Sequence, residues 1–232
     1  MIAVIIQARM GSKRLPGKVL KTLGIENILN ILVKRLKKSQ IVEKIIISTT
    51  NKKEDDKIIE FCNANKIKTF RGSEKDLIDR FIKTAEYYNL STIVRITGDC
   101  PLVDPFLIDK AIKIFFSEGL DYFSNTCPPK LSHYPDGSDI EIFEIGTLKE
   151  INRLKLKPKY REHLTNFYWK EKKYKTFLLK DIDNFSNIKY SVDTLEDFER
   201  LEKLYRFYKN KIYDVTTLEI INFLENLNET KI

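Results

Sequence analysis

The chain has 232 residues, 42% of them hydrophobic and 32% charged, and its formal net charge is +8. This length and composition allow a large buried core. No apolar run approaches the roughly 20 residues that a membrane-spanning helix needs, and the apolar N-terminal stretch is too short for a secretory signal peptide. We therefore expect a folded cytoplasmic protein without a membrane partner. The lysines are spread through amphipathic segments without interleaved aromatic residues, which favours solvated helix faces, or a preference for small anionic substrates, over nucleic-acid binding.

Strand-like and helical segments alternate along the first half of the chain. Apolar runs rich in β-branched residues predict strands at 2–7, 44–49, 68–70 and 92–97. Apolar residues at helical spacing predict helices at 28–38, 53–65, 75–88 and 106–116. This alternation predicts a doubly wound, mostly parallel α/β sheet with a crossover connection after each strand.

The alternation becomes irregular in the second half. Three prolines and a glycine predict a loop at 127–137. The strands predicted after it are 138–143, 175–180 and 189–192, and the predicted helices are 147–153, 161–170 and 195–208. Because no repeat or low-complexity linker divides the chain, we expect a single domain over 1–232, with a nucleotide-binding half at about 1–120 and an elaborated half at about 121–232.

The cysteines indicate neither a disulfide framework nor a structural zinc site. Cys62, Cys100 and Cys127 are odd in number and far apart, no CxxC pair occurs, and the chain has only two histidines. We therefore expect ordinary thiols at all three positions.

The first predicted strand leads directly into a basic, glycine-containing loop, ARMGSKRLPGK at 8–18. Gly11 and Gly17 would let the backbone approach a ligand closely. The cations of the loop are Arg9, Lys13, Arg14 and Lys18. Ligands of open α/β sheets bind beyond the carboxyl ends of the strands, and amides and guanidinium groups match phosphate oxygens. We predict a triphosphate site, although the loop has neither P-loop nor GxGxxG spacing, and a basic surface turn is the alternative.

Two aspartates close predicted strands and are candidate Mg²⁺ ligands. Asp99 follows the strand at 92–97, and Asp193 follows the run at 189–192 and precedes a helix. Carboxylate oxygens near phosphates are the hard ligands that Mg²⁺ prefers. Instead of binding a metal, Asp99 could form a turn or cap a helix N-terminus. Asp193 could likewise cap a helix, in a capping box completed by Glu196.

Five segments, in this order, resemble the cytidylyltransferases that make CMP-activated sugars. They are ARMGSKRLPGK at 8–18, RITGDCPLVDP at 95–105, YPDGSDIE at 134–141, REHLT at 161–165 and VDTLEDFE at 192–199. FRGSEKDLIDRF, at 70–81, lies between the first two. The sequence is most similar to the branch typified by the spore-coat polysaccharide biosynthesis protein F. The resemblance implies a nucleotide-diphospho-sugar transferase-like, Rossmann-like fold and a homodimer.

The resemblance also implies roles for the matched positions. CTP would be bound by Ala8, Arg9, Gly11, Ser12, Arg14, Lys18, Arg71, Gly72, Ser73, Thr97 and Gly98. Within this set, the segment 71–73 would read the edge of the base. Asp99 and Asp193 would hold Mg²⁺ as the cofactor.

The reaction implied by the resemblance is attack of an acceptor oxygen on the α-phosphorus, with pyrophosphate leaving. Positioning and charge neutralisation dominate such a step, so the expected catalytic residues are Arg9, Lys18 and Asp99. A phosphate or carboxylate acceptor needs no general base, whereas a sugar hydroxyl needs a base or activation by the metal.

The acceptor is expected to bind in the second half of the chain. The candidate residues are Asp136, Asp139, Glu141, Arg161 and His163. Strand alternation over 138–143 would place Asp139 and Glu141 on one face. The alternatives are a charged sheet edge for the carboxylates and a structural role for His163.

These observations predict a Mg²⁺-dependent nucleotidyltransferase. It would transfer CMP from CTP to a sugar, sugar acid or polyol phosphate for surface glycan synthesis. One alternative is a nucleotide-sugar glycosyltransferase, which would carry a DxD motif that Gly98-Asp99-Cys100 does not supply. The other is a basic nucleic-acid-binding protein, which would bind random oligonucleotides in a salt-sensitive manner.

Overall fold

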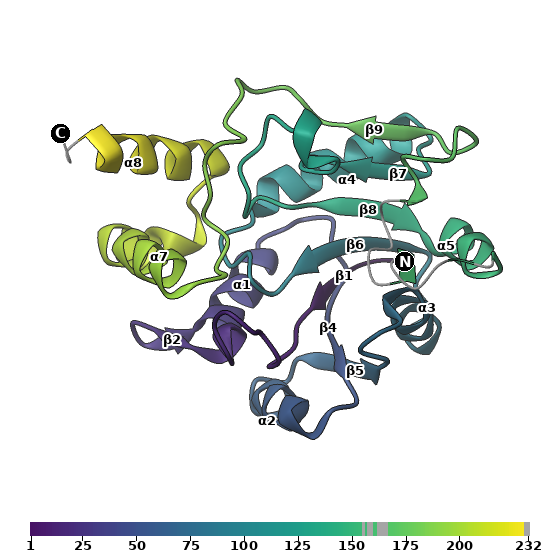
Figure 1. Ribbon diagram of the computed structural model, residues 1–232, viewed down its shortest axis with the longest axis horizontal. Coiled ribbons are helices and arrows are strands. Elements are labelled where there is room, and N and C mark those ends of the chain that lie inside the picture. Colours follow the sequence, from purple (N-terminus) through teal and green to yellow (C-terminus); the bar gives the residue numbers. More distant parts are fainter. Residues whose placement is uncertain (155, 157–159, 162–166, 230–232) are drawn as a thin grey trace.

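A seven-stranded sheet runs through the centre of the protein, seen in a computed structural model that describes residues 1–154, 156, 160–161 and 167–229 (Figure 1). In spatial order the strands are β5 (Lys68–Gly72), β4 (Lys44–Thr50), β1 (Ile2–Gln7), β6 (Thr92–Thr97), β8 (Glu141–Glu144), β7 (Tyr122–Ser124) and β9 (Thr176–Leu178). Strands from both halves of the chain therefore belong to one sheet.

The strand directions bring several loops to one edge of the sheet. The neighbours β5, β4, β1 and β6 are parallel, β8 is antiparallel to both β6 and β7, and β9 is parallel to β7. The carboxyl ends of β1, β4, β5 and β6 and the amino end of β8 consequently lie along the same edge. The prediction of a mostly parallel, doubly wound α/β sheet is confirmed.

Helices cover both faces of the sheet (Figure 1). Those that pack on one face are α1 (Ile28–Leu36), α2 (Asp56–Ala64) and α4 (Pro105–Ser117). Those on the other face are α3 (Leu77–Tyr87) and α5 (Ile145–Asn152). Alternate residues of β1 explain the two layers, because Val4 and Ile6 point to the first group and Ala3 and Ile5 to the second.

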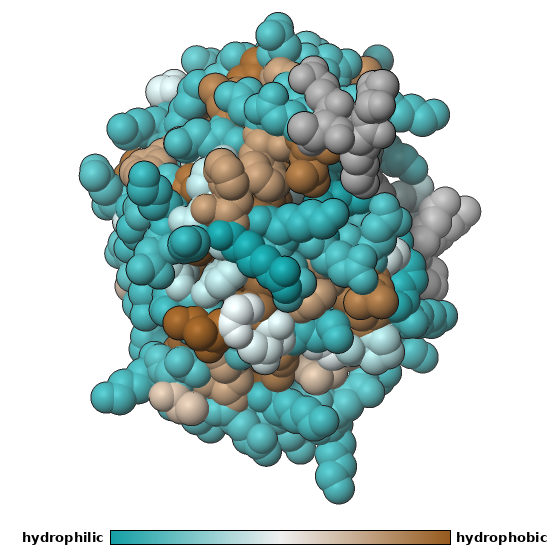
Figure 2. Space-filling view, turned by 90° about the vertical axis from the view of Figure 1, so that its left-hand side faces the viewer, coloured by the Kyte–Doolittle hydropathy of each residue, from teal (hydrophilic) through white to brown (hydrophobic). Residues whose placement is uncertain are grey.

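A third apolar cluster joins the end of the chain to its beginning. Helices α7 (Leu195–Tyr208) and α8 (Thr217–Glu229) pack beside α1 and the hairpin of β2 (Thr22–Leu23) and β3 (Glu26–Asn27). Figure 2 looks onto this side of the molecule.

The 3-10 helices of the described residues include η1 (Lys18–Leu20), η2 (Lys53–Asp55), η3 (Pro129–Leu131) and η5 (Lys209–Tyr213). On the side of α7 and α8, apolar patches are separated by hydrophilic side chains (Figure 2). Among the helices of the described residues, none is long and apolar enough to span a bilayer.

Arg35 of α1 is among the largest fully buried side chains of the described residues. Its guanidinium donates to the carbonyl oxygens of Leu102 and Val103, both at 3.1 Å, and to those of Val215, at 2.6 Å, and Ile212. Burial lowers the pKa of Arg35 to about 10. One charged side chain thus links the first helix, the loop after β6 and the segment before α8.

Several predicted elements agree closely with the structure, and others do not. The strands predicted at 2–7 and 92–97 and the helix at 195–208 have the predicted bounds. The strand predicted at 138–143 begins only at Glu141, and the helix predicted at 161–170 lies partly outside the described residues. Neither β7 nor α8 was predicted.

The strand predicted at 189–192 is wrong. The amides of Tyr190 and Ser191 donate to the carbonyl of Asp136, and the amide of Val192 donates to that of Asp99. The described backbone therefore forms only an isolated bridge, between Asp136 and Lys189. The extended, apolar pattern is real, but its hydrogen bonds go to loops instead of a neighbouring strand.

Candidate active site

A pocket of about 610 Å³ opens at the shared edge of the sheet. Its walls contain most of the predicted nucleotide-binding residues, namely Ala8, Arg9, Gly11, Ser12, Arg14, Lys18, Thr97 and Gly98. Asp99 and Asp193 also line it, together with Gln7, Lys13, Val19, Lys52, Glu74 and Lys75. The two predicted aspartates and the basic loop, far apart in sequence, therefore meet in one cavity.

The basic loop is held in a tight turn by its own backbone. The carbonyl of Met10 accepts from the amides of Ser12, at 2.8 Å, and Gly17, at 3.0 Å. Gly17 has φ +69°, a left-handed conformation that a residue with a side chain rarely adopts. The amide of Met10 donates to the buried carboxylate of Asp55 at 2.7 Å, which anchors the loop to η2.

Close packing also brings β6 against this loop. A side chain at Gly98 would place a Cβ 3.1 Å from that of Ala8 and 3.2 Å from the carbonyl oxygen of Gln7. Glycine at this position therefore lets the end of β6 approach the start of the loop, which sets Asp99 opposite the loop cations.

The cations of the pocket are paired with its carboxylates. The Lys18 Nζ atom lies 2.6 Å from Asp99 Oδ2 and 3.0 Å from Asp193 Oδ1. The guanidinium of Arg14 lies 2.8 Å from Asp193 Oδ1. On the opposite wall, Glu74 lies 3.4 Å from the guanidinium of Arg9 and 2.8 Å from the ammonium of Lys52. The site thus combines several positive groups, each paired with a carboxylate, in one pocket.

The ion pairs shift the pKa values of both Lys18 and Asp193. Burial alone would lower the pKa of Lys18, but Asp99 and Asp193 outweigh it and raise this pKa above its usual value. Burial would raise the pKa of Asp193, but hydrogen bonds from Lys18 and Lys189 lower it. Lys18 is therefore a cation and Asp193 an anion at neutral pH.

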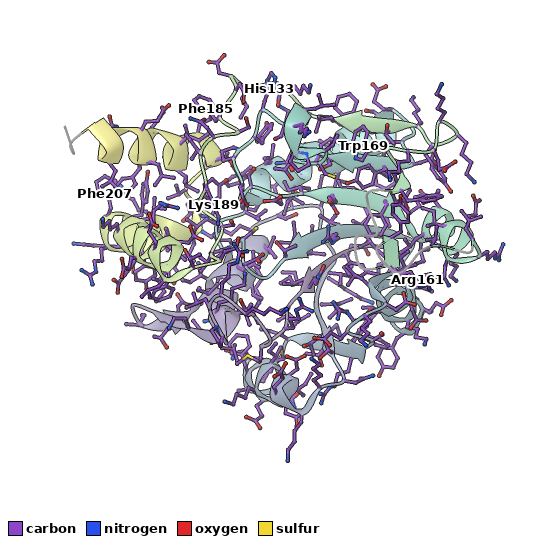
Figure 3. All side chains as sticks on the ribbon, viewed as in Figure 1. His133, Arg161, Trp169, Phe185, Lys189 and Phe207 are labelled. Carbon is purple, nitrogen blue, oxygen red and sulfur yellow. The ribbon has the colours of Figure 1, made fainter. Side chains whose placement is uncertain are left out.

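The helix-cap alternatives for the two aspartates are wrong, whereas Asp99 does lie in the turn that follows β6. The N-cap of α4 is Asp104, not Asp99. The N-cap of α7 is Thr194, whose capping box is completed by Asp197, not a box of Asp193 and Glu196. The carboxylate of Asp193 therefore does not cap the helix, although its backbone amide donates to Asp197 at 2.9 Å. It lines the pocket and pairs with Lys189, which lies in the segment next to α7 (Figure 3).

The aspartate pair fits a hard divalent cation. One oxygen of Asp99 and one of Asp193 converge on a single cationic atom, Lys18 Nζ, within 3.0 Å. Carboxylate oxygens are the ligands Mg²⁺ prefers, and the ion keeps waters or phosphate oxygens in its remaining positions. Among the described residues, no group of three or more His, Cys, Asp or Glu side chains is arranged to hold a metal by itself.

Three predicted nucleotide-binding residues lie outside the pocket wall. Arg71 donates to the carbonyl oxygens of Thr50, at 2.9 Å, and Lys52, at 2.7 Å, and also pairs with Asp56. Gly72 packs against Arg80, and the Ser73 hydroxyl accepts from the amide of Asp76. These residues shape the loop whose next two members, Glu74 and Lys75, line the pocket.

Glu141 does not reach the pocket. It is buried in an ion pair with Arg95 of β6. The Arg95 guanidinium also donates to Gln7 Oε1, at 3.1 Å from Nη2 and 3.3 Å from Nε. This pairing leaves the carboxylate of Glu141 engaged and turns the amide oxygen of Gln7 away from the cavity.

Sequence reasoning missed Gln7 as a pocket residue. It is the last residue of β1 and lines the cavity directly before the basic loop. A polar side chain at the end of a buried strand is the signal that could have identified it. With its oxygen bonded to Arg95, its NH₂ group is the part left to contact a substrate.

Asp136 and Asp139 lie beside the pocket without lining it. Asp139 accepts from the Thr126 hydroxyl at 2.7 Å and the Gly137 amide at 2.8 Å. Burial raises the pKa of Asp139 to about 6. Burial also raises the pKa of the neighbouring Asp136, and the charges of Asp193 and Asp99 add to this rise. The two carboxylates therefore border the acidic side of the site.

Arg161 is separated from the other predicted acceptor residues. It donates to Asp76 and to the Asn152 side chain, both at 2.6 Å, and lies near α3, far across the molecule from Lys189 (Figure 3). His163 lies outside the described residues. The described chain does not bring Arg161 to the pocket.

The raised pKa of Asp139 predicts a pH-dependent stability difference. Its carboxyl is protonated in both states well below pH 4, but above pH 6 the folded protein must hold a charge that burial disfavours. Relative to Asp139→Asn, the wild type should therefore lose about 2 kcal/mol of unfolding free energy between pH 4 and pH 7. Urea unfolding at both values measures this, with exposed Asp183→Asn as control; a difference that does not change with pH would contradict the assignment.

The fold and the site fit an α/β nucleotidyltransferase, with a basic, glycine-containing loop and two carboxylates at the carboxyl edge of a mostly parallel sheet. The sequence model of the cytidylyltransferase family matches residues 3–220, and the chain belongs to this family. It is therefore an enzyme that transfers a nucleotidyl group. This membership favours nucleotidyl transfer over the glycosyltransferase and nucleic-acid-binding alternatives.

Known proteins of similar sequence or structure agree with this membership. The chain is 37% identical over 231 residues to the spore coat polysaccharide biosynthesis protein SpsF of Bacillus subtilis, covering 96% of this chain and 93% of that protein. A cytidylyltransferase structure from Leptospira borgpetersenii superposes with a TM-score of 0.91 at 32% identity. The match covers 98% of this chain and 95% of that chain. A CMP:2-keto-3-deoxy-manno-octonic acid synthetase complexed with CTP shares the fold, with a TM-score of 0.66 at 15% identity. The match covers 88% of this chain and 98% of that chain.

Proposed function

We propose that the enzyme is Mg²⁺-dependent and transfers CMP from CTP to a sugar, sugar acid or polyol phosphate, with release of pyrophosphate, for surface polysaccharide synthesis. The observation that carries this proposal is the meeting of the basic loop with Asp99 and Asp193 in one pocket. The likeness to SpsF, which is named for spore coat polysaccharide biosynthesis, supports the pathway class.

The loop would bind the triphosphate. Its backbone turns around the Met10 carbonyl, and Arg9 and Arg14 lie where they can exchange their carboxylate partners for phosphate oxygens. Lys18, 11% exposed in its side chain, stands deepest among the paired loop cations and would stabilise charge at the reacting phosphate.

Asp99 and Asp193 would hold Mg²⁺, which when bound neutralises charge on the phosphates. Asp99 is fixed by the end of β6, and its carbonyl accepts from the Val192 amide at 2.8 Å. That hydrogen bond couples the positions of the two carboxylates. The same contact therefore keeps the ligand pair aligned while substrates enter.

The second half of the chain would bind the acceptor. Asp136 and Asp139 border the carboxylate side of the pocket, and the NH₂ group of Gln7 is available on its floor. Glu141 and Arg161 would act through other residues, because each is paired within the protein. An acceptor presenting hydroxyl groups to the carboxylates and an anionic oxygen to the cations suits this division of charge.

A substrate screen tests the proposal. The protein is incubated with each of the four nucleoside triphosphates, Mg²⁺ and a panel of sugar, sugar-acid and polyol-phosphate acceptors, and pyrophosphate release is followed. We expect release with CTP and one acceptor class, at least about tenfold above the other triphosphates. Release that does not depend on an acceptor, or thermal shifts with none of the triphosphates, would contradict the function.

The homodimer, the cytoplasmic location and the absence of a nucleic-acid partner stay predictions. Light scattering after size-exclusion chromatography measures the mass in solution, and a single-chain mass at micromolar concentration would contradict the dimer.

A further inference from the structure

We infer that the cleft between α7, η5 and α8 is a second ligand site, which binds a single molecule of an alkyl phosphate. The alkyl chain would lie against three aromatic rings, and the phosphate group at Lys209 and Lys211. The cleft lies at the C-terminal end of α7, whereas Asp193 precedes the other end, about 21 Å away along a helix of 14 residues. The site is therefore separate from the active site, and the inference does not depend on the proposed function.

Two hollows adjoin in this cleft. One has a volume of about 770 Å³ and the other of about 460 Å³, and Phe207, Tyr208 and Glu219 line both of them. Figure 3 shows Phe207 between α7 and α8, on the outer side of the molecule. Phe207 is 65% exposed, which is unusual for a phenylalanine, and exposed apolar surface beside a hollow is typical of a binding site.

The apolar surface of the cleft is a cluster of three rings. The centroid of the Phe207 ring lies 4.9 Å from that of Tyr208 and 4.7 Å from that of Phe223, and the latter two are 5.9 Å apart. The Tyr208 hydroxyl donates to the Glu219 carbonyl at 2.9 Å, which ties the end of α7 to α8. An alkyl chain that covers these rings removes apolar surface from water on both sides of the contact.

Two lysines at the larger hollow supply positive charge. Lys209 and Lys211 line it, and among the described residues no carboxylate lies at ion-pair distance from either ammonium group. The acidic residues of the same hollow have other partners, because Asp214 pairs with Lys38 and Glu219 accepts two hydrogen bonds at the start of α8, at 2.7 and 2.8 Å. A phosphate monoester carries nearly two negative charges at neutral pH, which the two ammonium groups complement.

A single molecule fits the cleft better than a membrane surface does. The hollows are concave, and their rim also carries the carboxylates of Asp214 and Glu219, which would face an anionic bilayer. One alkyl phosphate can instead place its charged group at the lysines and its chain in the hollows.

The backbone of Lys209 is strained at the edge of the cleft. Lys209 is the C-cap of α7 and has φ +49° and ψ −128°, a conformation that glycine adopts readily and a lysine rarely. Such strain persists where the surrounding structure enforces it, and it is concentrated at binding sites. Glycine would relieve the strain but would remove the ammonium group, so this chain keeps a cation at the cleft although the cation lowers stability.

Isothermal titration calorimetry with decyl phosphate tests the inference on the full chain. The ligand is kept below the concentration at which it forms micelles, and the wild type should show a single saturable site. Phe207→Ser should weaken binding at least about tenfold, because it removes apolar contact surface. Lys211→Met should weaken binding at least about fivefold, because it removes one of the two charges. Decanol and inorganic phosphate should each bind at least about tenfold more weakly than decyl phosphate, because each lacks one half of the ligand.

Lys209→Gly should have two opposite effects. It relieves the backbone strain, so the melting temperature should rise by about 2–4 °C. It also removes an ammonium group from the cleft, so decyl phosphate should bind at least about fivefold more weakly. Asn89→Gly is the matched control, because Asn89 follows α3 with φ +55° and lines neither hollow. It should raise the melting temperature without changing the binding of decyl phosphate.

Three results would overturn the inference. The first is the absence of saturable decyl phosphate binding to the wild type. The second is equal affinity in the wild type and in both the Phe207→Ser and Lys209→Gly variants, with melting curves that show both variants folded. The third is flotation with phosphatidylglycerol vesicles without binding of monomeric decyl phosphate, which would identify a membrane surface as the partner instead.

Discussion

The double variant Asp99→Asn, Asp193→Asn is expected to lose CMP transfer by about a thousandfold or more while it stays folded. Asparagine keeps the size of each side chain but removes both negative charges that face the basic loop. The fold should tolerate this change because both carboxylates are directed at cations of an open pocket, and the backbone contact between Val192 and Asp99 remains.

The activity of this variant is measured as pyrophosphate release with CTP, Mg²⁺ and the acceptor found in the screen. Circular dichroism and the melting temperature confirm folding, and Asp183→Asn, which removes one exposed carboxylate, is the control for each single variant. Each single variant should also be impaired, because one remaining carboxylate would leave the proposed Mg²⁺ with half of its protein ligands. Activity of the double variant within about tenfold of the wild type would rule out the metal role of the pair.

The variant Arg35→Met should lower the free energy of unfolding by about 3–5 kcal/mol. The guanidinium serves four buried carbonyl groups, and methionine fills the space without donating to any of them. Each unpaired buried carbonyl costs about 1–3 kcal/mol, and the relief of a buried charge offsets part of the total. For a chain of this size, the loss corresponds to a decrease in melting temperature of about 10 °C.

Urea unfolding and thermal melting measure this effect. Lys37→Met is the matched control, because Lys37 is the exposed C-cap of the same helix. Arg35→Lys should be intermediate, since an ammonium group keeps the charge but reaches fewer carbonyl oxygens. If Arg35→Met were no less stable than Lys37→Met, the buried hydrogen bonds would not be holding the C-terminal segment.

The meeting of the basic loop with Asp99 and Asp193 in one pocket could be predicted from the sequence because its signals are local. The basic loop follows β1 directly, and Asp99 follows β6, so parallel strand order alone brings the loop and Asp99 to one edge. Asp193 joins them from a distant segment, which its position after an extended run and before a helix suggested. At the basic loop, Asp99 and Asp193, the sequence pattern and the order of the parallel strands therefore predict the same pocket.

The acceptor side could not be predicted as well because it depends on pairing across the fold. Alternation along the strand indicates the face on which Glu141 lies, but not that its carboxylate is bound to Arg95. The run at 189–192 has the composition of a strand, yet its amides find loop carbonyls. Gln7 was missed because a neutral amide carries no charge signal, and its role follows only from the contact with Arg95.

The hydrogen bonds of Arg35 also have a consequence for the order in which a growing chain can fold. Translation produces α1 early, but two of the four carbonyl groups that receive the guanidinium belong to Ile212 and Val215, close to the C-terminus. Until those residues leave the ribosome, Arg35 retains water as its partner, because burying an unpaired charge is costly. A nascent chain of this enzyme therefore closes the core around α1 only after Val215 has been synthesised.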